Sequence, residues 1–524
     1  MSGQPQLDYP AGRKAIIAFA GIAGSVAMVL SATIANVAIP SVMGAFGVGQ
    51  DQAQWAATAF IATMVVSQLL SAWFSTALGM RLAFLILNAT FLVGALICVV
   101  TPNLDVLIFG RVLQGFAAGS VQPMVMVLIF RLFPAEQRGF AMGLYSMGIM
   151  IAPTLGPMVG GFVIDALSWR EVFLVPVPVC LLSMLLGLMF LPAGGGSARW
   201  PGFDWLSFAL LCASIFMLLA AGANGQRWGW LSDTLVTIAT LGLLSGVLFV
   251  WRQLVSSAPI LDMSLFRIPQ FAAAVFLALV FGFGNFASSY LMPVYVQEVQ
   301  GFPPSLAGTM LVPAGLLMMV GSPLFGRLTD SYPGHLMVML GLILFSLGNW
   351  LLSETDVNTS FLTFVLLVCL ARSGMSLINP ALSAAALGAL TAEQLTRGSG
   401  TINFCRQFGG AVGITSIVVF MERRTQFHGD ALAATQTADN VASAELLERV
   451  RSLMGEGGVV EPQRAAAALH YLGQVVEAQA TTMGFKDGFM ALVVVFVLAL
   501  FPAWLLGAVR RRSAGQAGRV STRR

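Results

Sequence analysis

The amino-acid sequence predicts an all-α protein that is embedded in a membrane and crosses it roughly fourteen times. Of its 524 residues, 57% are hydrophobic and only 10% are charged, whereas a water-soluble protein carries about 25% charged residues. The mean hydropathy is positive, at +0.84. Because one helical span needs ~20 apolar residues, the hydrophobic residues supply roughly fourteen spans. A soluble enzyme fold is excluded as the main architecture.

Apolar segments of spanning length follow one another along the whole chain. We predict spans at residues 15–37, 53–77, 82–101, 105–130, 138–163, 171–191, 204–222, 233–251, 271–297, 305–328, 335–353, 361–388, 398–421 and 486–508. An even number of spans places both termini on one side of the membrane. No cleavable signal precedes the first span, so the first helix is expected to be retained as signal and anchor.

The basic residues indicate which side that is. One set of loops, together with the two tails, contains sixteen lysines and arginines, and the opposite set contains eight. Six of those eight lie in or beside one long loop, where the positive-inside rule has little force. Both termini are therefore predicted to be cytoplasmic.

That long loop, at residues 422–485, is the only sizeable segment outside the predicted spans. It contains two amphipathic stretches, near 440–454 and 462–480, in which apolar residues recur at helical spacing. We predict a small helical hairpin on the side opposite the termini. It is either a packed cap over the membrane domain or a docking surface for a partner, because periodicity does not say what an apolar stripe contacts.

The sequence lacks the residues that ATP hydrolysis or metal catalysis requires. Its two lysines, Lys14 and Lys486, follow no G-x-x-x-x-G frame, so no Walker A loop is present. The histidines lie at span ends or outside spans, and the cysteines lie in apolar runs without paired spacing. We expect no metal, no cofactor and no nucleic-acid partner, and an enzyme is the minor hypothesis. A secondary transporter, a channel or a lipid-facing scaffold remain.

The fifth predicted span has one face made of small residues. At intervals of four residues it carries Gly148, Ala152, Gly156 and Gly160. Such a face lets a neighbouring helix pack closely. Pro153 and Pro157 in the same segment remove backbone hydrogen bonds and permit a bend. A static bundle needs only the glycines, so the prolines favour a moving gate.

Three arginines lie inside predicted spans. Arg111 is about six residues into span 4, ~9 Å from its start, so its side chain either reaches the membrane surface or faces a cavity. Arg372 lies about eleven residues into span 12 and Arg406 about eight into span 13, where Asn403 shares its face. A charge at such depth costs a few kcal/mol unless it borders a polar interior. We therefore predict that Arg372 and Arg406 line a cavity.

These segments resemble a known family. The motif R-x-x-Q-G, at Arg111, Gln114 and Gly115, is similar to the span-4 motif of the major facilitator superfamily. The motif G-P-x-x-G-G, from Gly156 through Pro157 and Gly160 to Gly161, resembles its span-5 antiporter motif. The fourteen spans resemble the drug:proton antiporter branch typified by the EmrB and QacA exporters, and the long loop resembles the EmrB type in particular. The resemblance covers nearly the whole chain.

The resemblance implies a major facilitator fold with two six-helix halves and an inserted helix pair. The expected parts are a cytoplasmic tail at 1–14, an N-terminal half at 15–191, the inserted pair with its linkers at 192–270, a C-terminal half at 271–508 that includes the periplasmic loop 422–485, and a basic cytoplasmic tail at 509–524. The resemblance also implies a bacterial inner membrane, and a periplasmic membrane-fusion adaptor and an outer-membrane channel as partners.

The loop motif of the superfamily, G-x-x-x-D, occurs once in good form, at Gly326, Arg327 and Asp330. In the first half, Ala72 and Thr76 stand where the glycine and the aspartate are expected. We expect the good copy, together with the motifs of spans 4 and 5, to couple the gates of the transporter.

The resemblance also implies an acid in span 1, but this sequence has Ser31 there. None of the Asp and Glu residues lies near the middle of a span; the nearest are Asp105, Asp165 and Glu298, at predicted span ends. Proton antiport needs a carboxylate that is alternately charged and neutral. Glu298 and Asp105 are the candidate proton carriers, and the alternative for each is an acid that simply faces water.

We predict a multidrug efflux transporter that exports amphipathic compounds by proton-coupled antiport. The candidate cavity residues are Asn36, Arg372, Asn403, Arg406 and Gln407. Arginines inside the spans attract anions when no acid lies inside the spans beside them. The sequence therefore favours weak acids, such as fatty acids or acidic uncouplers, over quaternary ammonium dyes as substrates. The alternatives are a dedicated exporter of one endogenous metabolite or lipid, and a membrane scaffold or sensor that transports nothing.

Overall fold

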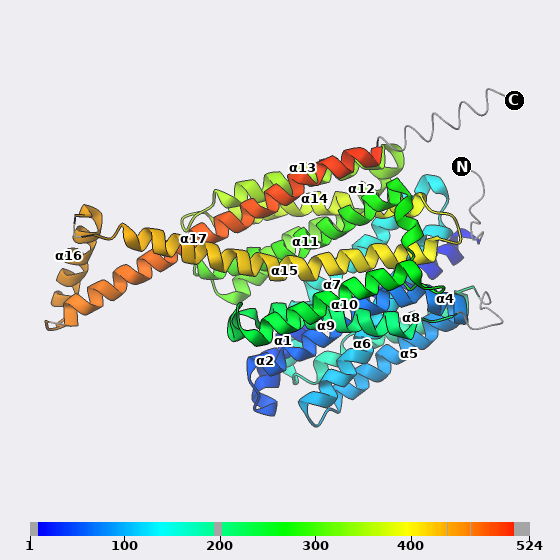
Figure 1. The fold of residues 1–524 in the computed structure, drawn as a ribbon, viewed down its shortest axis with the longest axis horizontal. Coiled ribbons are helices and arrows are strands. Elements are labelled where there is room, and N and C mark those ends of the chain that lie inside the picture. Colours follow the sequence, from blue (N-terminus) through cyan, green and yellow to red (C-terminus); the bar gives the residue numbers. More distant parts are fainter. Residues whose placement is uncertain (1–8, 193–201, 438, 462, 508–524) are drawn as a thin grey trace.

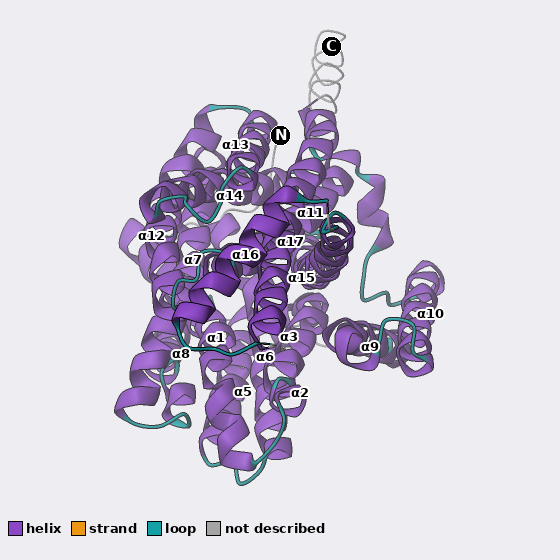
Figure 2. Ribbon diagram, turned by 90° about the vertical axis from the view of Figure 1, so that its left-hand side faces the viewer, coloured by secondary structure: helices purple, strands orange, loops and turns teal. Residues whose placement is uncertain are grey.

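The computed structural model describes residues 9–192, 202–437, 439–461 and 463–507. Across these residues the regular structure is helical throughout, without a strand (Figure 2). Thirteen of the described helical segments are long and apolar enough to cross a membrane. They coincide with thirteen predicted spans, and helix α7 (Arg138–Ala166), of 29 residues, coincides with the span predicted at 138–163. The all-α membrane fold is thereby confirmed.

The first half of the bundle runs from α1 to α8. Its helices are α1 (Ala11–Phe46), α2 (Gln50–Ala53), α3 (Trp55–Ser67), α4 (Ser71–Leu78), α5 (Met80–Val99), α6 (Leu104–Leu132), α7 and α8 (Val177–Phe190). A short 3-10 turn, Gln68–Leu70, joins α3 to α4 within one predicted span. Helix α6 forms the core of this half, because every residue from Ala117 to Phe130 is buried.

Helices α9 (Trp205–Trp228) and α10 (Asp233–Val255) form a separate pair. They pack on each other, and the Arg252 Nε donates to Asp204 Oδ1 at 3.0 Å to join their ends. Helix α9 also lies against α3 of the first half and α15 of the second. The apolar cluster at this contact includes Val65 and Val66 of α3, Leu211 and Ile215 of α9, and Phe404 and Phe408 of α15.

The second half contains the remaining helices. They are α11 (Pro269–Glu298), α12 (Pro304–Ser331), α13 (Gly334–Ser353), α14 (Phe361–Gly388), α15 (Leu395–Ala434), α16 (Val441–Glu456) and α17 (Gln463–Leu498). The start of α1 and the last helical segment of α17 lie at one end of the bundle, and α16 projects beyond the other end (Figure 1). We call these the terminal end and the α16 end.

The segment predicted as the loop 422–485 is mostly helical. Helix α15 runs on to Ala434 without a break, and α17 begins at Gln463, so both extend beyond their predicted spans. No proline interrupts α15, and its polar residues after the predicted span are compatible with a solvated helix. Asp487 of α17 links the two helices by accepting hydrogen bonds from His428 Nε2 at 2.7 Å and Arg424 Nε at 2.5 Å, both on α15. Helix α16 lies at their tip (Figure 1).

Candidate functional site between the two halves

At the terminal end, the C-terminal turns of α12 meet the first turn of α7. The Asp330 carboxylate accepts hydrogen bonds from the backbone N–H groups of Gly139, at 2.6 Å, and Phe140, at 3.0 Å. The Arg327 guanidinium lies over the Phe140 ring, 4.6 Å from its centre. A carboxylate at a helix N-terminus satisfies free N–H groups and complements the helix dipole. The residues of the predicted loop motif therefore join the two halves here.

Glycines show that α7 and α12 approach each other closely at this end. A Cβ on Gly143 of α7 would lie 2.4 Å from the Ser322 carbonyl oxygen of α12, and a Cβ on Gly326 would lie 2.4 Å from the Gly139 carbonyl oxygen. Eighteen residues make five helical turns, so a glycine eighteen positions away lies on the same face. Gly161 of α7 and Gly308 of α12 occupy those positions, and each has nothing within 4 Å of an added Cβ. The close glycine packing of the terminal end is therefore not repeated at these two positions nearer the α16 end.

The other contacts between the halves also lie toward the terminal end. Arg131 of α6 donates to the Ala392 carbonyl at 2.7 Å, and the Asn403 Nδ2 of α15 lies 3.2 Å from the Met126 Sδ of α6. A Cβ on Gly400 of α15 would lie 2.8 Å from the Gln68 carbonyl oxygen. In the described part of the chain, these contacts between the halves thus gather toward the terminal end.

A cluster of polar side chains lies where the halves meet. The Arg406 guanidinium of α15 donates to Asn379 Oδ1 of α14 at 2.9 Å and to Asn403 Oδ1. Asn379 Nδ2 in turn donates to Ser146 Oγ of α7 at 3.0 Å, across the interface. The hydroxyl of the neighbouring Tyr145 donates to the Gln122 carbonyl of α6 at 3.1 Å. The structure therefore brings the predicted residues Asn403 and Arg406 together, and all acceptors of Arg406 here are uncharged.

Arg111 sits in a second network inside the first half. It is fully buried, and its guanidinium donates to Ser31 Oγ at 3.0 Å, to Gln114 Oε1 at 2.9 Å and to the Ala56 carbonyl at 3.1 Å. It also lies over the Phe60 ring, 4.1 Å from its centre. Arg111 thus links α1, α3 and α6, and Ser31, at the position of the family acid, is one of its direct partners.

The neighbouring Gly115 belongs to the same motif. A Cβ there would lie 2.3 Å from the Phe60 carbonyl oxygen, so α6 and α3 approach each other closely at this point.

Arg372 lies apart from the cluster around Arg406. Its guanidinium donates to Asn285 Oδ1 at 3.0 Å and to Ser289 Oγ at 2.9 Å, both on α11. The physical reason is the position along the helix: Asn379, which accepts from Arg406, follows Arg372 on α14 by seven residues, about two turns or ~10 Å nearer the terminal end. The two arginines predicted to line the cavity therefore have different hydrogen-bond partners.

The small-residue face of α7 packs on α1 within the first half. A Cβ on Gly156 would lie 2.3 Å from Thr33 Oγ1, and a Cβ on Gly160 would lie 2.6 Å from Ile34 Cγ1. The Thr33 hydroxyl donates to the Ala152 carbonyl at 3.3 Å. This seam joins helices of one half, so it differs from the contact between the halves at Gly143.

Three candidate residues fall outside the described side chains, and Gln407 has no hydrogen bond to the described part of the chain. The side chains of Asn36, Pro153 and Pro157 are not described. Gln407 is half-buried on α15.

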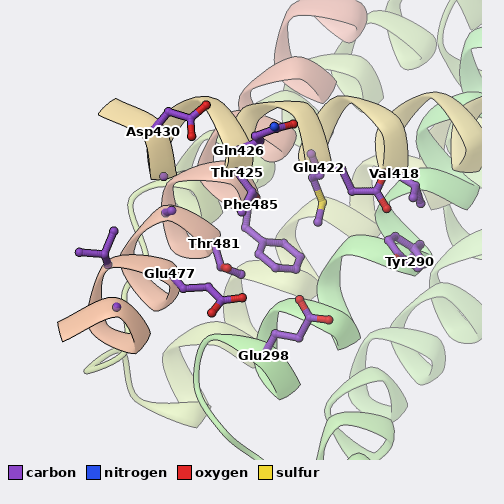
Figure 3. Close-up of a pocket in the computed structure, with 15 residues that line it drawn as sticks. Tyr290, Glu298, Val418, Glu422, Thr425, Gln426, Asp430, Glu477, Thr481 and Phe485 are labelled. Atoms are coloured by element: carbon purple, nitrogen blue, oxygen red, sulfur yellow. The ribbon is translucent and has the colours of Figure 1, made fainter. Parts of the chain in front are cut away.

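The two candidate proton carriers lie at helix ends on the α16 side. Asp105 is exposed in the first turn of α6, where a carboxylate favours the helix dipole. Glu298 is exposed at the end of α11 and borders a pocket of about 500 Å³ between α11, α15 and α17. Glu422 of α15 and Glu477 of α17 line the same pocket (Figure 3). Neither acid reaches the network of Arg111 or the cluster of Arg406.

Several functional candidates were not predicted from the sequence. Gly139 and Gly143 form a small-x-x-x-small pair at the start of α7, a signal that was available. Tyr145, Ser146 and Asn379 are polar residues inside apolar segments, but nothing in the sequence pairs α7 with α14.

Comparisons with known proteins agree with this architecture. A family model described as Major Facilitator Superfamily matches residues 21–414. The chain is 26% identical over 479 residues to the multidrug export protein EmrB of Haemophilus influenzae, covering 91% of this chain and 92% of EmrB. It is 30% identical over 410 residues to the lincomycin resistance protein LmrB of Listeria innocua, covering 78% and 86%.

Solved structures share the fold at low sequence identity. The human organic anion transporter MFSD10 aligns with a TM-score of 0.61 at 14% identity, over 94% of this chain and all of MFSD10. A double-tryptophan mutant of XylE aligns with a TM-score of 0.62 at 11% identity, over 95% and 96%. The family model matches most of the chain, and the described helices form two halves that contact each other, as set out above. The chain therefore belongs to the Major Facilitator Superfamily.

Proposed function

We propose that this protein is a multidrug efflux transporter of a bacterial inner membrane, with both termini in the cytoplasm. It exports small amphipathic compounds by alternating access, in which the two halves open in turn to each side of the membrane. Relatives that carry the names of multidrug export and drug resistance proteins match most of its length, and the excess of basic residues on the terminal side supports the orientation.

The observation that carries the proposal is that the hydrogen bonds and close packing between the halves described above gather toward the terminal end. Gly143 packs against Ser322, whereas Gly161, on the same face five turns away, has no neighbour within 4 Å. With the terminal end in the cytoplasm, this conformation is closed to the cytoplasm and open to the periplasm. Arg111, Gln114 and the motif of Gly326, Arg327 and Asp330 transmit the movement between gates.

The cluster around Arg406 is the candidate substrate site. It lies at the closed end of the space between the halves, and its guanidinium contacts only neutral acceptors. Since no described carboxylate neutralises Arg406 or Arg372, an amphipathic weak acid is the preferred substrate class. Transport is coupled to protons, and a substrate that binds as its anion supplies the charge that Ser31 lacks. Glu298 and Asp105 remain the candidate carriers on the protein.

A pump-deleted bacterial host that expresses the protein tests this function. We expect increased resistance to acidic uncouplers, and the increase should vanish when the proton gradient is collapsed. An unchanged susceptibility to acids and to quaternary ammonium dyes, with the protein present in the membrane, would contradict an efflux function. Resistance to the dyes alone would retain efflux and remove the acid preference.

The α16 end is the candidate docking surface for a periplasmic adaptor that leads to an outer-membrane channel. Val441 and Leu453 of α16 are large apolar residues that are 70% and 60% exposed. Exposed apolar residues on a projecting helix favour a protein partner. The packed-cap alternative would need these side chains to be covered by the bundle.

Replacing both residues with glutamate tests the docking role. Val441→Glu with Leu453→Glu should leave uptake into inverted vesicles unchanged, because the membrane helices are untouched. The same double variant should lose resistance in cells that have an outer membrane. Loss of uptake in the vesicles as well would assign the hairpin to the stability of the fold.

A further inference from the structure

Arg372 forms a polar site of its own between α11 and α14. The residue is 6% exposed. In addition to Asn285 Oδ1 and Ser289 Oγ, its guanidinium meets the Asn285 carbonyl at 3.4 Å and Met292 Sδ at 3.8 Å. Every one of these acceptors is neutral, and within the described residues no carboxylate pairs with Arg372. A buried charge is normally paired, and here both terminal nitrogens donate to neutral acceptors without a compensating negative charge.

The position of Ser289 connects this site to the space between the halves. On α11, Asn285 and Met292 face α14, whereas Gly282 and Phe286 face α15, where they meet the Arg406 carbonyl and Gly410. Ser289 is exposed and lies on the helix face between these two contacts. Since α14 and α15 themselves contact the first half, through Asn379 and Asn403, that face of α11 borders the space between the halves.

The two guanidinium groups stand in sequence along this space. Asn379, the partner of Arg406, follows Arg372 by seven residues on α14, which corresponds to ~10 Å along the helix. Helix α14 runs from the α16 end to the terminal end, so Arg406 marks the closed end and Arg372 lies nearer the open end. An anion that leaves Arg406 toward the open end passes Arg372 next.

We propose that Arg372, Asn285 and Ser289 form a second anion-binding site, which receives an amphipathic organic carboxylate from the Arg406 site on its way out. A planar guanidinium binds a carboxylate by two parallel hydrogen bonds, and the carboxylate would take the place of the neutral acceptors on Asn285 and Ser289. The Asn285 amide adds a donor, the Ser289 hydroxyl donates to the Asn285 carbonyl at 2.7 Å, and Met292 provides an apolar contact. This site rests on the proposed export of weak acids and adds to it a second binding step.

The number of anions bound by the purified full chain tests the site. Binding of radiolabelled 2-naphthoate is measured on the protein in lipid nanodiscs, with empty nanodiscs as background. We expect two naphthoates per chain for the wild type and one for Arg372→Gln. Arg406→Gln should also leave one, and the variant with both changes should bind none.

Two further variants separate charge from folding. Ser289→Asp places a carboxylate beside Arg372, so it should occupy the guanidinium and remove one naphthoate without leaving a buried charge unpaired. Arg423→Gln removes an exposed charge from α15, the helix that carries Arg406, and should leave two bound naphthoates per chain. The thermal unfolding midpoint of each variant is measured alongside.

The outcomes distinguish this site from the function on which it rests. A wild type that exports naphthoate but binds only one per chain overturns the second site and leaves the proposed function intact. The same conclusion follows when Arg372→Gln and Ser289→Asp, folded as the wild type, still bind two. A wild type that binds no naphthoate overturns both the acid preference and the second site.

Discussion

Gly143→Leu is expected to abolish export while the protein remains in the membrane. A Cβ at this position already lies 2.4 Å from the Ser322 carbonyl oxygen, which belongs to backbone and cannot turn away. Overpacking of this kind costs typically about 1–3 kcal/mol, and here the cost falls on the conformation that is closed at the terminal end. The equilibrium between the two conformations should therefore shift about 5- to 150-fold toward opening at that end.

Gly161→Leu is the informative partner of this variant. Gly161 lies on the same face of α7 as Gly143, and a Cβ added there has no atom within 4 Å. The conformation described above should therefore tolerate the leucine. If the halves alternate, the α16 end must close in the other conformation, and the leucine should then oppose that closure. Export should fall in both variants, but the shift in conformation should have opposite signs.

Substrate uptake into inverted vesicles measures export, and cysteine accessibility at each end measures the shift. Gly44→Leu provides the control, because Gly44 is exposed near the end of α1 with nothing within 4 Å. Wild-type uptake in Gly143→Leu would mean that the contact with Ser322 plays no part in the transport cycle.

Arg406→Gln is expected to weaken the transport of weak acids without preventing that of neutral compounds. A hydrogen bond to a charged group contributes about 1.5–3 kcal/mol, so the KM for an acidic substrate should rise about 10- to 150-fold. The glutamine amide can still donate to Asn379 and Asn403, so the polar interface with Ser146 should persist. Arg406→Lys keeps the charge but loses the planar pair of donors, so its KM for the acidic substrate should lie between those of the wild type and Arg406→Gln.

Initial uptake rates in inverted vesicles, for an acidic uncoupler and for a neutral amphiphile, separate these effects. Arg423→Gln on the same helix serves as the control for net charge. An equal loss for both substrates would assign Arg406 to the structure of the interface. An unchanged KM for the acid would remove Arg406 from the substrate site.

The fold was predictable from composition and periodicity, because a bilayer requires long apolar helices. The ends of α15 and α17 were not. Beyond the predicted spans the hydropathy of both helices falls, but the helices continue into water. Their length there is set by helix propensity and by the hydrogen bonds of Asp487 with His428 and Arg424.

The candidate site was predictable where residues share one helix. Asn403 and Arg406 are three residues apart on α15 and lie together, as do Arg111 and Gln114 on α6. Arg372 and Arg406 were grouped by their depth in the predicted spans, and this depth does not say that Arg372 bonds to Asn285 and Ser289 whereas Arg406 bonds to Asn379 and Asn403. The pairing of α7 with α12 and α14 depends on contacts between distant segments, which a single sequence does not specify.

The most direct test of alternating access is the distance between spin labels at Gly161→Cys and Gly308→Cys in lipid nanodiscs. Both positions have open space around them, so the labels should not disturb the packing. Pulsed electron paramagnetic resonance should give two distances: a long one for the conformation open at the α16 end, and a shorter one for the conformation closed there. Changes of pH or addition of an acidic substrate should alter their proportions, and Gly143→Leu should favour the shorter distance. One unchanged distance under every condition, in a doubly labelled protein that still transports, would contradict the account.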